Sequence, residues 1–372
     1  MRVLLAWVMV IGSLAAATPQ ERARARDLGI TPGAGQPGAL NAITDVAGVR
    51  VGQVTLIEGD RVRTGVTAVL PHEGNLFQQK VPGAVFIGNA FGKLAGSTQV
   101  QELGSIETPI VLTNTLAVGT AVEAVVRWTL AQDGNTNVRS VNALVGETND
   151  GGLNDIRALP VTQAHVQQAI TSATSGPVAE GAVGAGTGTI AFGWKGGIGT
   201  SSRIVRRGGT GTEGSWTVGV LVQTNYGGRL TIDGRQIWRT LTPGRAGGPP
   251  STWSQDADGS CMIIVATDAP LDARDLERLA ARAVFAMART GSTFSNGSGD
   301  FAIAFSTTPE NRITGATTPQ PRTFVPTDGV SALFEATMDA TEEAIYNSLF
   351  KAVDMTANGR TIRALPLDAV KK

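Results

Sequence analysis

The chain has 372 residues, of which 42% are hydrophobic, and it carries 31 basic and 31 acidic side chains. This composition is typical of a globular protein with enough apolar material for a large core. The formal net charge is +0 and no extended run of Lys or Arg occurs. The electrostatic footprint of a nucleic-acid-binding protein is therefore absent.

The first residues have the pattern of an export signal. Arg2 supplies a positive start, residues 3–14 an apolar centre, and the alanines at 15–17 a small-residue cleavage site. The apolar centre is shorter than the ~20 residues that a membrane span needs. We therefore expect residues 1–17 to be a signal peptide and the mature protein to be periplasmic or secreted, without membrane contact after export. A buried first helix is the alternative interpretation.

After an arm rich in Arg, Pro and Gly at residues 18–45, the chain forms short β-branched runs bounded by Gly or Pro, which predict strands. The expected strands in the first half are residues 49–55, 65–70 and 83–88. A stripe of valines predicts a helix over 116–130. A weaker helix is expected within 156–172.

Residues 181–199 are so rich in glycine that a phosphate-binding loop has to be considered. Gly188 and Gly193 have the spacing of that motif, but Trp194 stands where the motif requires Lys. We therefore expect tight turns or a substrate-lining loop here instead of a nucleotide site.

The second half predicts strands over 216–224, 261–267 and 301–306, with a less structured stretch at 229–258. A helix is expected from Pro270 to Gly291, and the longest helix over 330–353. Strands and helices occur in blocks and do not alternate strictly, which favours a layered mixed fold over a doubly wound parallel one.

Cys261 is the only cysteine, so no intrachain disulfide can form, although export would permit one. We expect a buried strand residue and no catalytic thiol, because neither His72 nor His165 is near it in sequence. Both histidines are expected to be structural. The metal-ligand spacings His-x-x-x-His and Cys-x-x-Cys do not occur. We therefore predict no metal and no other cofactor.

Four polar clusters border apolar runs, at residues 147–155, 225–227, 259–260 and 295–300. Polar residues at strand ends are where active sites are usually built. The pair Gly259 and Ser260 also suits self-cleavage. The Ser260 hydroxyl could attack the Gly259 carbonyl, and cleavage would leave Ser260 as an N-terminus carrying both a nucleophile and an amine. A simple turn is the alternative, since Gly and Ser are common in turns.

In this order the clusters resemble those of the self-processing L-aminopeptidase/D-esterase and β-aminopeptidase family. Supporting stretches lie at 63–71, 112–115 and 266–271, and the resemblance runs from about Arg24 to Leu367. It implies an α+β fold, an αββα four-layer sandwich similar to N-terminal-nucleophile hydrolases. It also implies a precursor that cleaves itself into an α chain, 18–259, and a β chain, 260–372, which together form one folded domain.

The resemblance also implies roles for individual residues. Ser260 would be the nucleophile in self-cleavage and in turnover, with its freed amine held near Ser298 and Asp300 as a candidate base. Asn225 would donate its side-chain amide to the oxyanion. Glu147 would bind the substrate's free amino group through charge-assisted hydrogen bonds.

Asn114 would line the same pocket. The other site residues also have structural interpretations: Glu147 as a solvated turn residue, Asn225 as a turn former and Asp300 as the cap of a strand start. The resemblance further implies a homo-oligomer of αβ units.

The predicted function is release of N-terminal β-amino acids, or of L- or D-α-residues, from short peptides, amides or esters that have a free N-terminal amine. An aminoacyl amidase or acyltransferase that uses the same acyl-enzyme is an alternative. A non-catalytic binding protein on this scaffold is another, and it would require Ser260 to be idle.

Overall fold

The computed structural model describes residues 22–207, 214–243 and 259–371. The predicted signal peptide and residues 244–258 of the predicted loop before Gly259 lie outside these residues. No helix in the described ranges is long and apolar enough to cross a membrane.

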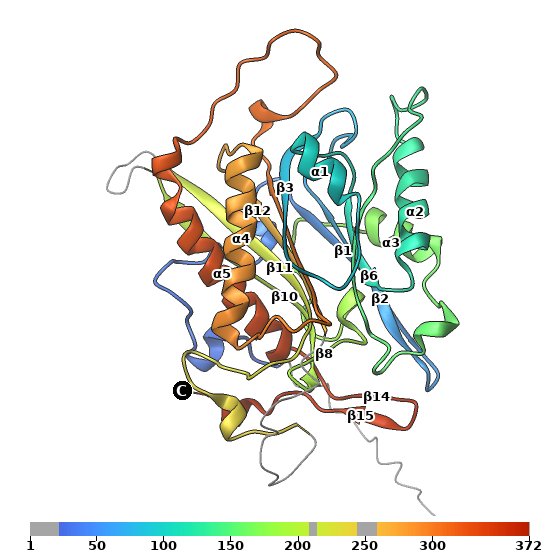
Figure 1. The fold of residues 1–372 in the computed structure, drawn as a ribbon, viewed down its shortest axis with the longest axis vertical. Coiled ribbons are helices and arrows are strands. Elements are labelled where there is room, and N and C mark those ends of the chain that lie inside the picture. The colour runs from blue at the N-terminus through green and yellow to red at the C-terminus, as the bar shows by residue number, and fades with distance from the viewer. Residues whose placement is uncertain (1–21, 208–213, 244–258, 372) are drawn as a thin grey trace, which may run out of the picture.

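Two large sheets lie face to face at the centre of the molecule (Figure 1). The first contains, in spatial order, β1 (Arg50–Glu58), β2 (Val62–Leu70), β6 (Ile110–Asn114), β7 (Leu144–Thr148) and β4 (Leu94–Ala95). The second contains β10 (Gly197–Arg206), β11 (Ser215–Asn225), β12 (Ser260–Thr267), β13 (Gly299–Ser306), β3 (Val81–Ala90) and β5 (Ser105–Ile106). All six predicted strands are present.

Helices cover the outer faces of both sheets (Figure 1). The first sheet packs against α2 (Val118–Leu130) and α3 (Gln163–Thr171), and the second against α4 (Ala273–Thr290) and α5 (Ser331–Phe350). The short α1 (Ser97–Leu103) lies beside β3. The order helix, sheet, sheet, helix is the αββα sandwich that the family resemblance implied.

The central strand β12 explains why residues 261–266 are continuously apolar. Cys261, Ile263 and Val265 point into the core between the second sheet and its helices. Met262 and Ile264 point into the core between the two sheets. A strand that is buried on both faces needs an unbroken apolar run, whereas a half-exposed strand alternates. Ser260 is thereby held at the start of one of the most deeply buried strands.

The weaker helix expected within 156–172 is present as α3. A separate 3-10 turn, Ile156–Ala158, precedes it, because Pro160 cannot continue a helix and restricts the residue before it. The start predicted for the next helix was wrong: it begins not at Pro270 but at Ala273, where the Asp272 carboxylate accepts from the Asp275 N–H at 2.8 Å.

Strand β10 was not predicted, because it begins within the glycine-rich stretch, at Gly197–Gly199. Its glycines serve close packing. A Cβ at Gly199 would lie 1.9 Å from the Ala344 carbonyl oxygen of α5. Only glycine therefore lets α5 approach this strand so closely.

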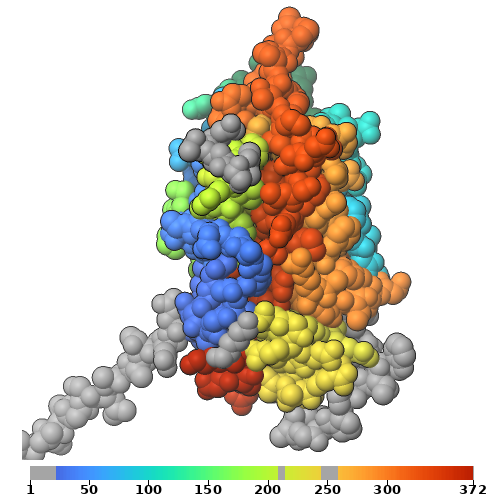
Figure 2. Space-filling view, turned by 90° about the vertical axis from the view of Figure 1, so that its left-hand side faces the viewer, coloured from blue at the N-terminus to red at the C-terminus, as the bar shows by residue number. Residues whose placement is uncertain are grey.

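The predicted N-terminal arm, described from residue 22, packs along α5 (Figure 2). Ala25 is fully buried, and its N–H donates to Asn347 Oδ1 at 2.9 Å. The Arg26 guanidinium lies 3.0 Å from the buried Glu343 carboxylate. These contacts fasten the arm to the helix layer.

Candidate active site

Three of the four polar clusters meet where β11, β12 and β13 lie side by side. The antiparallel register of β11 and β12 places Asn225 opposite Ser260. The parallel register of β12 and β13 places Gly299 opposite Ser260 on its other side. Segments more than thirty residues apart in the sequence thus converge on one serine.

The Gly259 carbonyl lies at this junction, next to the Gly299 N–H and the Ser260 hydroxyl. The Gly299 N–H donates to its oxygen at 3.0 Å and polarises the carbonyl. The Ser260 Oγ lies 2.6 Å from the same oxygen. The hydroxyl therefore lies beside the carbonyl whose carbon it would attack.

Gly259 is required for a steric reason. A Cβ at this position would lie 2.0 Å from the Asn225 carbonyl oxygen and 2.6 Å from Tyr226 Cα. Both contacts are with backbone, which cannot move aside as a flexible side chain could. A larger residue would push the β11 and β12 ends apart and displace the carbonyl from Ser260.

Ser298 and Asp300, on either side of the Gly299 that pairs with Ser260, form a buried pair. The Ser298 hydroxyl donates to Asp300 Oδ1 at 2.9 Å. Burial raises the pKa of Asp300 to about 6, although bonds from Ser298 and the Cys261 backbone oppose the shift. Asp300 Oδ2 is buried without a hydrogen-bond partner among the described residues. A buried polar atom without a partner is unusual in a folded protein and marks this carboxylate as a candidate functional group.

Asn225 is held with its donor end available. The Ile190 N–H donates to Asn225 Oδ1 at 3.0 Å. Because the oxygen accepts this bond, the opposite end of the amide is Nδ2, a donor. An amide donor fixed before the reaction is what stabilisation of an oxyanion requires.

Neither Ile190 nor Lys195, which supports it, was predicted as a site residue. Lys195 is completely buried, and its Nζ donates to the carbonyls of Gly186, Thr189 and Gly196 at 2.9, 2.9 and 2.8 Å. Burial lowers its pKa to about 7, with the charge of Asp150 opposing this. These bonds fix the turns on either side of the hairpin that carries the Ile190 N–H.

Glu147, at the end of β7, approaches from the first sheet. It is 2% exposed, and its Oε1 accepts from the Lys93 backbone N–H at 2.9 Å. The Lys93 ammonium lies 3.7 Å away on a side chain that is itself 56% exposed. Burial raises the pKa of Glu147 against the effect of Lys93. Glu147 is thus a buried carboxylate whose cationic partner is in contact with solvent.

Glu147 and Ser260 line one groove, with a volume of about 790 Å³. The other residues that line it are Ala90, Phe91, Gly92, Lys93, Thr115, Asn149, Gly151, Gly152, Ile156, Asn225, Gly259 and Gly297. We call it the nucleophile groove. It brings together the Ser260 hydroxyl, the Asn225 amide and the Glu147 carboxylate, for which the sequence predicted the roles of nucleophile, oxyanion donor and amine-binding group.

Asn114 has a different position from the one that the sequence analysis gave it. Its Oδ1 accepts from the N–H groups of Leu116 and Ala117, both at 3.1 Å, and its Nδ2 donates to Thr64 Oγ1 at 2.9 Å. These bonds hold the turn into α2. Its neighbour Thr115 is the residue of this turn that lines the nucleophile groove.

The remaining candidates lie away from the groove. His72 accepts from the Gly74 N–H and bonds the Gln79 carbonyl, and His165 accepts from the Thr162 N–H at the start of α3. Cys261 is fully buried, and burial raises its pKa well above the ordinary value. In the part of the chain that the structure covers, no three His, Cys, Asp or Glu side chains gather as a metal site would need.

Comparison with known proteins decides the family. Residues 41–362 match the model of "Peptidase family S58". The chain belongs to peptidase family S58.

Curated relatives in this family cover nearly the whole chain. A β-peptidyl aminopeptidase of Sphingosinicella microcystinivorans is 44% identical, over 95% of this chain and 92% of its own length. A second, from Sphingosinicella xenopeptidilytica, is 41% identical, over 98% and 94%.

Solved structures agree with the fold. A protein from Pyrococcus horikoshii OT3 superposes with a TM-score of 0.85 at 46% identity, covering 94% of this chain and 98% of its own. A Burkholderia β-aminopeptidase superposes with a TM-score of 0.84 at 40% sequence identity, covering 94% of this chain and 97% of its own. The L-aminopeptidase D-Ala-esterase/amidase of Ochrobactrum anthropi superposes with a TM-score of 0.84 at 37% sequence identity, covering 93% of this chain and 96% of its own. Its fold is described as a variant of the N-terminal-nucleophile hydrolase fold. The predicted family, fold and enzyme class, a serine aminopeptidase, are confirmed.

The steric role of Gly259 predicts a processing defect in this S58 peptidase. Gly259→Ala should fold but cleave itself about 10–100-fold more slowly, because a displacement of about 1 Å removes the attack geometry. Gly119→Ala is the matched control, since its Cβ would meet nothing within 4 Å. The fraction of cut chain is followed by denaturing electrophoresis after expression. Normal cutting of Gly259→Ala would show that the contact with Asn225 does not matter.

The raised pKa of Asp300 predicts a pH dependence. If its carboxylate accepts the Ser260 proton during self-cleavage, the rate of self-cleavage should rise about tenfold per pH unit below about 6, where the carboxyl is protonated, and level off above. Asp300→Asn should be slow and lack this inflection. Asp268→Asn is the control, because burial also raises the pKa of Asp268, at the far end of β12. An unchanged inflection near pH 6 in Asp300→Asn assigns it to another group.

Proposed function

We propose that the protein is an exported, self-processing aminopeptidase that releases N-terminal residues from short peptides, amides or esters through an acyl-enzyme on Ser260. The observation that carries this proposal is the shared groove of Ser260 and Glu147. A buried carboxylate at the end of a substrate groove gives a reason why substrates need a free amine, since the ammonium would pair with it.

Self-cleavage would use the Gly259 carbonyl as its first substrate. The Ser260 Oγ attacks the carbonyl carbon, its proton passes to a base, and the Gly259–Ser260 C–N bond breaks with that nitrogen protonated. The resulting ester is hydrolysed by water. The products are the Gly259 carboxylate and a Ser260 that carries both a free amine and a free hydroxyl.

Turnover would repeat this chemistry on an external substrate. The substrate ammonium pairs with Glu147, and the scissile carbonyl lies over Ser260. The amine of Ser260 takes the hydroxyl proton and returns it to the leaving amine, while Asn225 Nδ2 donates to the oxyanion. The Asp300 carboxylate stabilises the protonated form of that amine. Water then releases the acyl residue.

The substrate class is tested with β-homo-, L- and D-aminoacyl anilides. Because the curated relatives are named β-peptidyl aminopeptidases, β-homo-aminoacyl anilides are expected to be cleaved, with activity retained in EDTA. N-acetylated anilides should be poor substrates. Release from acetylated and free substrates at equal rates would contradict the proposal.

The acyltransferase alternative makes the same acyl-enzyme and differs in the acceptor. It is distinguished by product analysis with added amines: peptide products that exceed free amino acid at low amine concentration would favour it. Hydrolysis that dominates under these conditions supports the aminopeptidase.

Glu147→Gln separates substrate binding from processing. The precursor should cut itself normally, because Gly259 has no free amine before cleavage. Turnover of aminoacyl substrates should fall roughly 10- to 100-fold in kcat/KM, as expected for loss of one charge-assisted interaction.

Glu107→Gln is the matched control for this variant. Glu107 is also a buried glutamate, with Lys80 Nζ at 3.5 Å and a backbone N–H donor, Asn142, at 2.8 Å, and it lies outside the nucleophile groove. Blocked self-cleavage with normal peptide turnover in Glu147→Gln would show that the carboxylate belongs to the processing machinery.

Export and assembly are further parts of this proposal. The apolar start of the sequence supports export. The intact mass of the mature protein should correspond to a chain that begins near residue 18. Light scattering of the native protein is expected to give a multiple of one αβ unit.

A further inference from the structure

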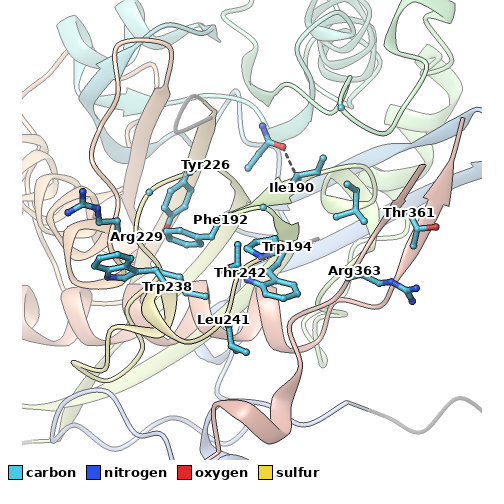
Figure 3. A pocket seen from close by; sticks show the side chains of 18 of the residues that line it. Ile190, Phe192, Trp194, Tyr226, Arg229, Trp238, Leu241, Thr242, Thr361 and Arg363 are labelled. Carbon is cyan, nitrogen blue, oxygen red and sulfur yellow. Dashed lines mark hydrogen bonds between the residues drawn. The ribbon is translucent and has the colours of Figure 1, made fainter. Parts of the chain in front are cut away.

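A second cavity, of about 700 Å³, lies beside the nucleophile groove. Phe192, Trp194, Trp238, Leu241 and Pro243 are among the residues that form its wall. Figure 3 shows the aromatic side chains gathered around it, with Arg229 toward one end and Arg363 toward the other. We call it the aromatic cavity. The proposed hydrolysis places neither the acyl residue nor its ammonium in this cavity.

The aromatic cavity and the nucleophile groove share Asn149, Gly152 and Asn225 as lining residues. Glu147 and Ser260 line only the nucleophile groove, whereas the aromatic wall lines only the second cavity. The oxyanion donor Asn225 thus stands at the boundary between the two. A substrate whose carbonyl oxygen lies on Asn225 can extend into both.

One hairpin links the aromatic wall to the oxyanion donor. It consists of β8 (Ile190–Ala191) and β9 (Trp194–Lys195), joined by Phe192 and Gly193. Ile190 N–H orients Asn225, and the side chains of Phe192 and Trp194 line the aromatic cavity. A group that packs against this wall therefore lies next to the hairpin that positions the donor.

The hairpin turn has an unfavourable backbone at an aromatic residue. Phe192 has φ +53° and Gly193 has φ +78°, the left-handed pattern of a two-residue hairpin turn that favours Asn or Gly at both positions. The Phe192 ring packs edge-to-face on the Tyr226 ring, with the two ring centroids 4.9 Å apart. A bulky residue held at positive φ is characteristic of binding sites and active sites.

Trp238 forms another part of the wall and is half-buried. Its ring has the guanidinium of Arg229 at 5.0 Å and that of Arg239 at 4.4 Å. These cation–π contacts hold the indole in place. The cavity therefore combines an apolar floor with a cationic rim.

The direction of the scissile bond decides which part of the substrate enters this cavity. On the mechanism proposed above, on which this inference rests, the acyl residue extends from Ser260 toward Glu147. The leaving amine must then extend away from Glu147, past Asn225. We propose that the aromatic cavity is the leaving-group subsite and that it takes an aromatic or large branched apolar residue on the carboxyl side of the cleaved bond.

The test holds the acyl residue constant and changes only the leaving group. Peptide amides with one common N-terminal residue and either Phe-NH2 or Gly-NH2 as leaving group have similar chemical reactivity and give the same acyl-enzyme. The wild type should prefer the Phe leaving group about tenfold or more in kcat/KM, the size of effect that one apolar pocket gives.

Trp238→Ala should remove most of this preference and leave kcat/KM for the Gly leaving group within about twofold. Leu241→Ala, at another point of the wall, is a second variant should Trp238→Ala fold poorly.

Trp216→Ala is the matched control. Trp216 is also half-buried and has an arginine, Arg207, 5.2 Å from its ring. It lies on β11 nine residues before Asn225, about 30 Å away along the strand. It should leave the leaving-group preference unchanged.

Binding is measured separately from turnover by calorimetry with 2-phenylethylamine and ethylamine as probes, since neither has a carbonyl that could be cleaved. 2-Phenylethylamine should bind the wild type and Trp216→Ala but not Trp238→Ala. Equal kcat/KM for the two leaving groups, with no selective binding of 2-phenylethylamine, would overturn the subsite and leave the aminopeptidase proposal intact. Selective, Trp238-dependent binding without turnover of any peptide amide would support the cavity as an apolar-amine site and contradict the proposed function.

Discussion

The site depends on how closely three strand ends approach one another around the Gly259 carbonyl. Asn225 and Gly299 flank Ser260 in register, and the backbone of Asn225 and Tyr226 leaves no room for a Cβ at residue 259. The Gly259–Ser260 peptide bond and the Gly299 N–H that bonds its carbonyl are therefore positioned by main-chain pairing. Side-chain rotamers alone could not fix them as firmly, because exposed side chains change conformation readily.

The site also contains buried ionisable side chains, and their burial reduces the stability of the folded chain. Asp300 and Lys195 are buried. Burial raises the pKa of Asp300 and lowers the pKa of Lys195, so that in both cases the neutral form is favoured. Because the folded pKa of Asp300 lies above its ordinary value, the folded chain binds this proton more tightly than the unfolded chain. Its contribution to stability therefore falls as the pH rises through the range from about 4 to about 6. The apolar packing of β12 and β13 on both faces offsets such costs.

Much of the frame could be predicted from the sequence, because its signals are local. Residues 261–266 show an apolar run, and the Gly at 291 ends α4 as expected. The parts that could not be predicted depend on contacts between distant segments. Strand β10 is hidden by glycines that serve packing against α5. Ile190 acts through its backbone N–H, which leaves no trace in residue type, and Lys195 is recognisable only once its three carbonyl partners are known. Asn114 shows the converse, since its side chain suits both a pocket and a turn, and here it bonds the turn into α2.

The central claim is that the residues around Gly259 make the chain cut itself there and expose Ser260 as the nucleophile. Intact mass measurement under denaturing conditions, with N-terminal sequencing of the smaller species, tests this most directly. The account predicts two chains, the smaller beginning Ser-Cys-Met-Ile at residue 260, and one uncut, inactive chain for Ser260→Ala. A wild-type protein that is active as a single uncut chain, or that is cut at another bond, would contradict it.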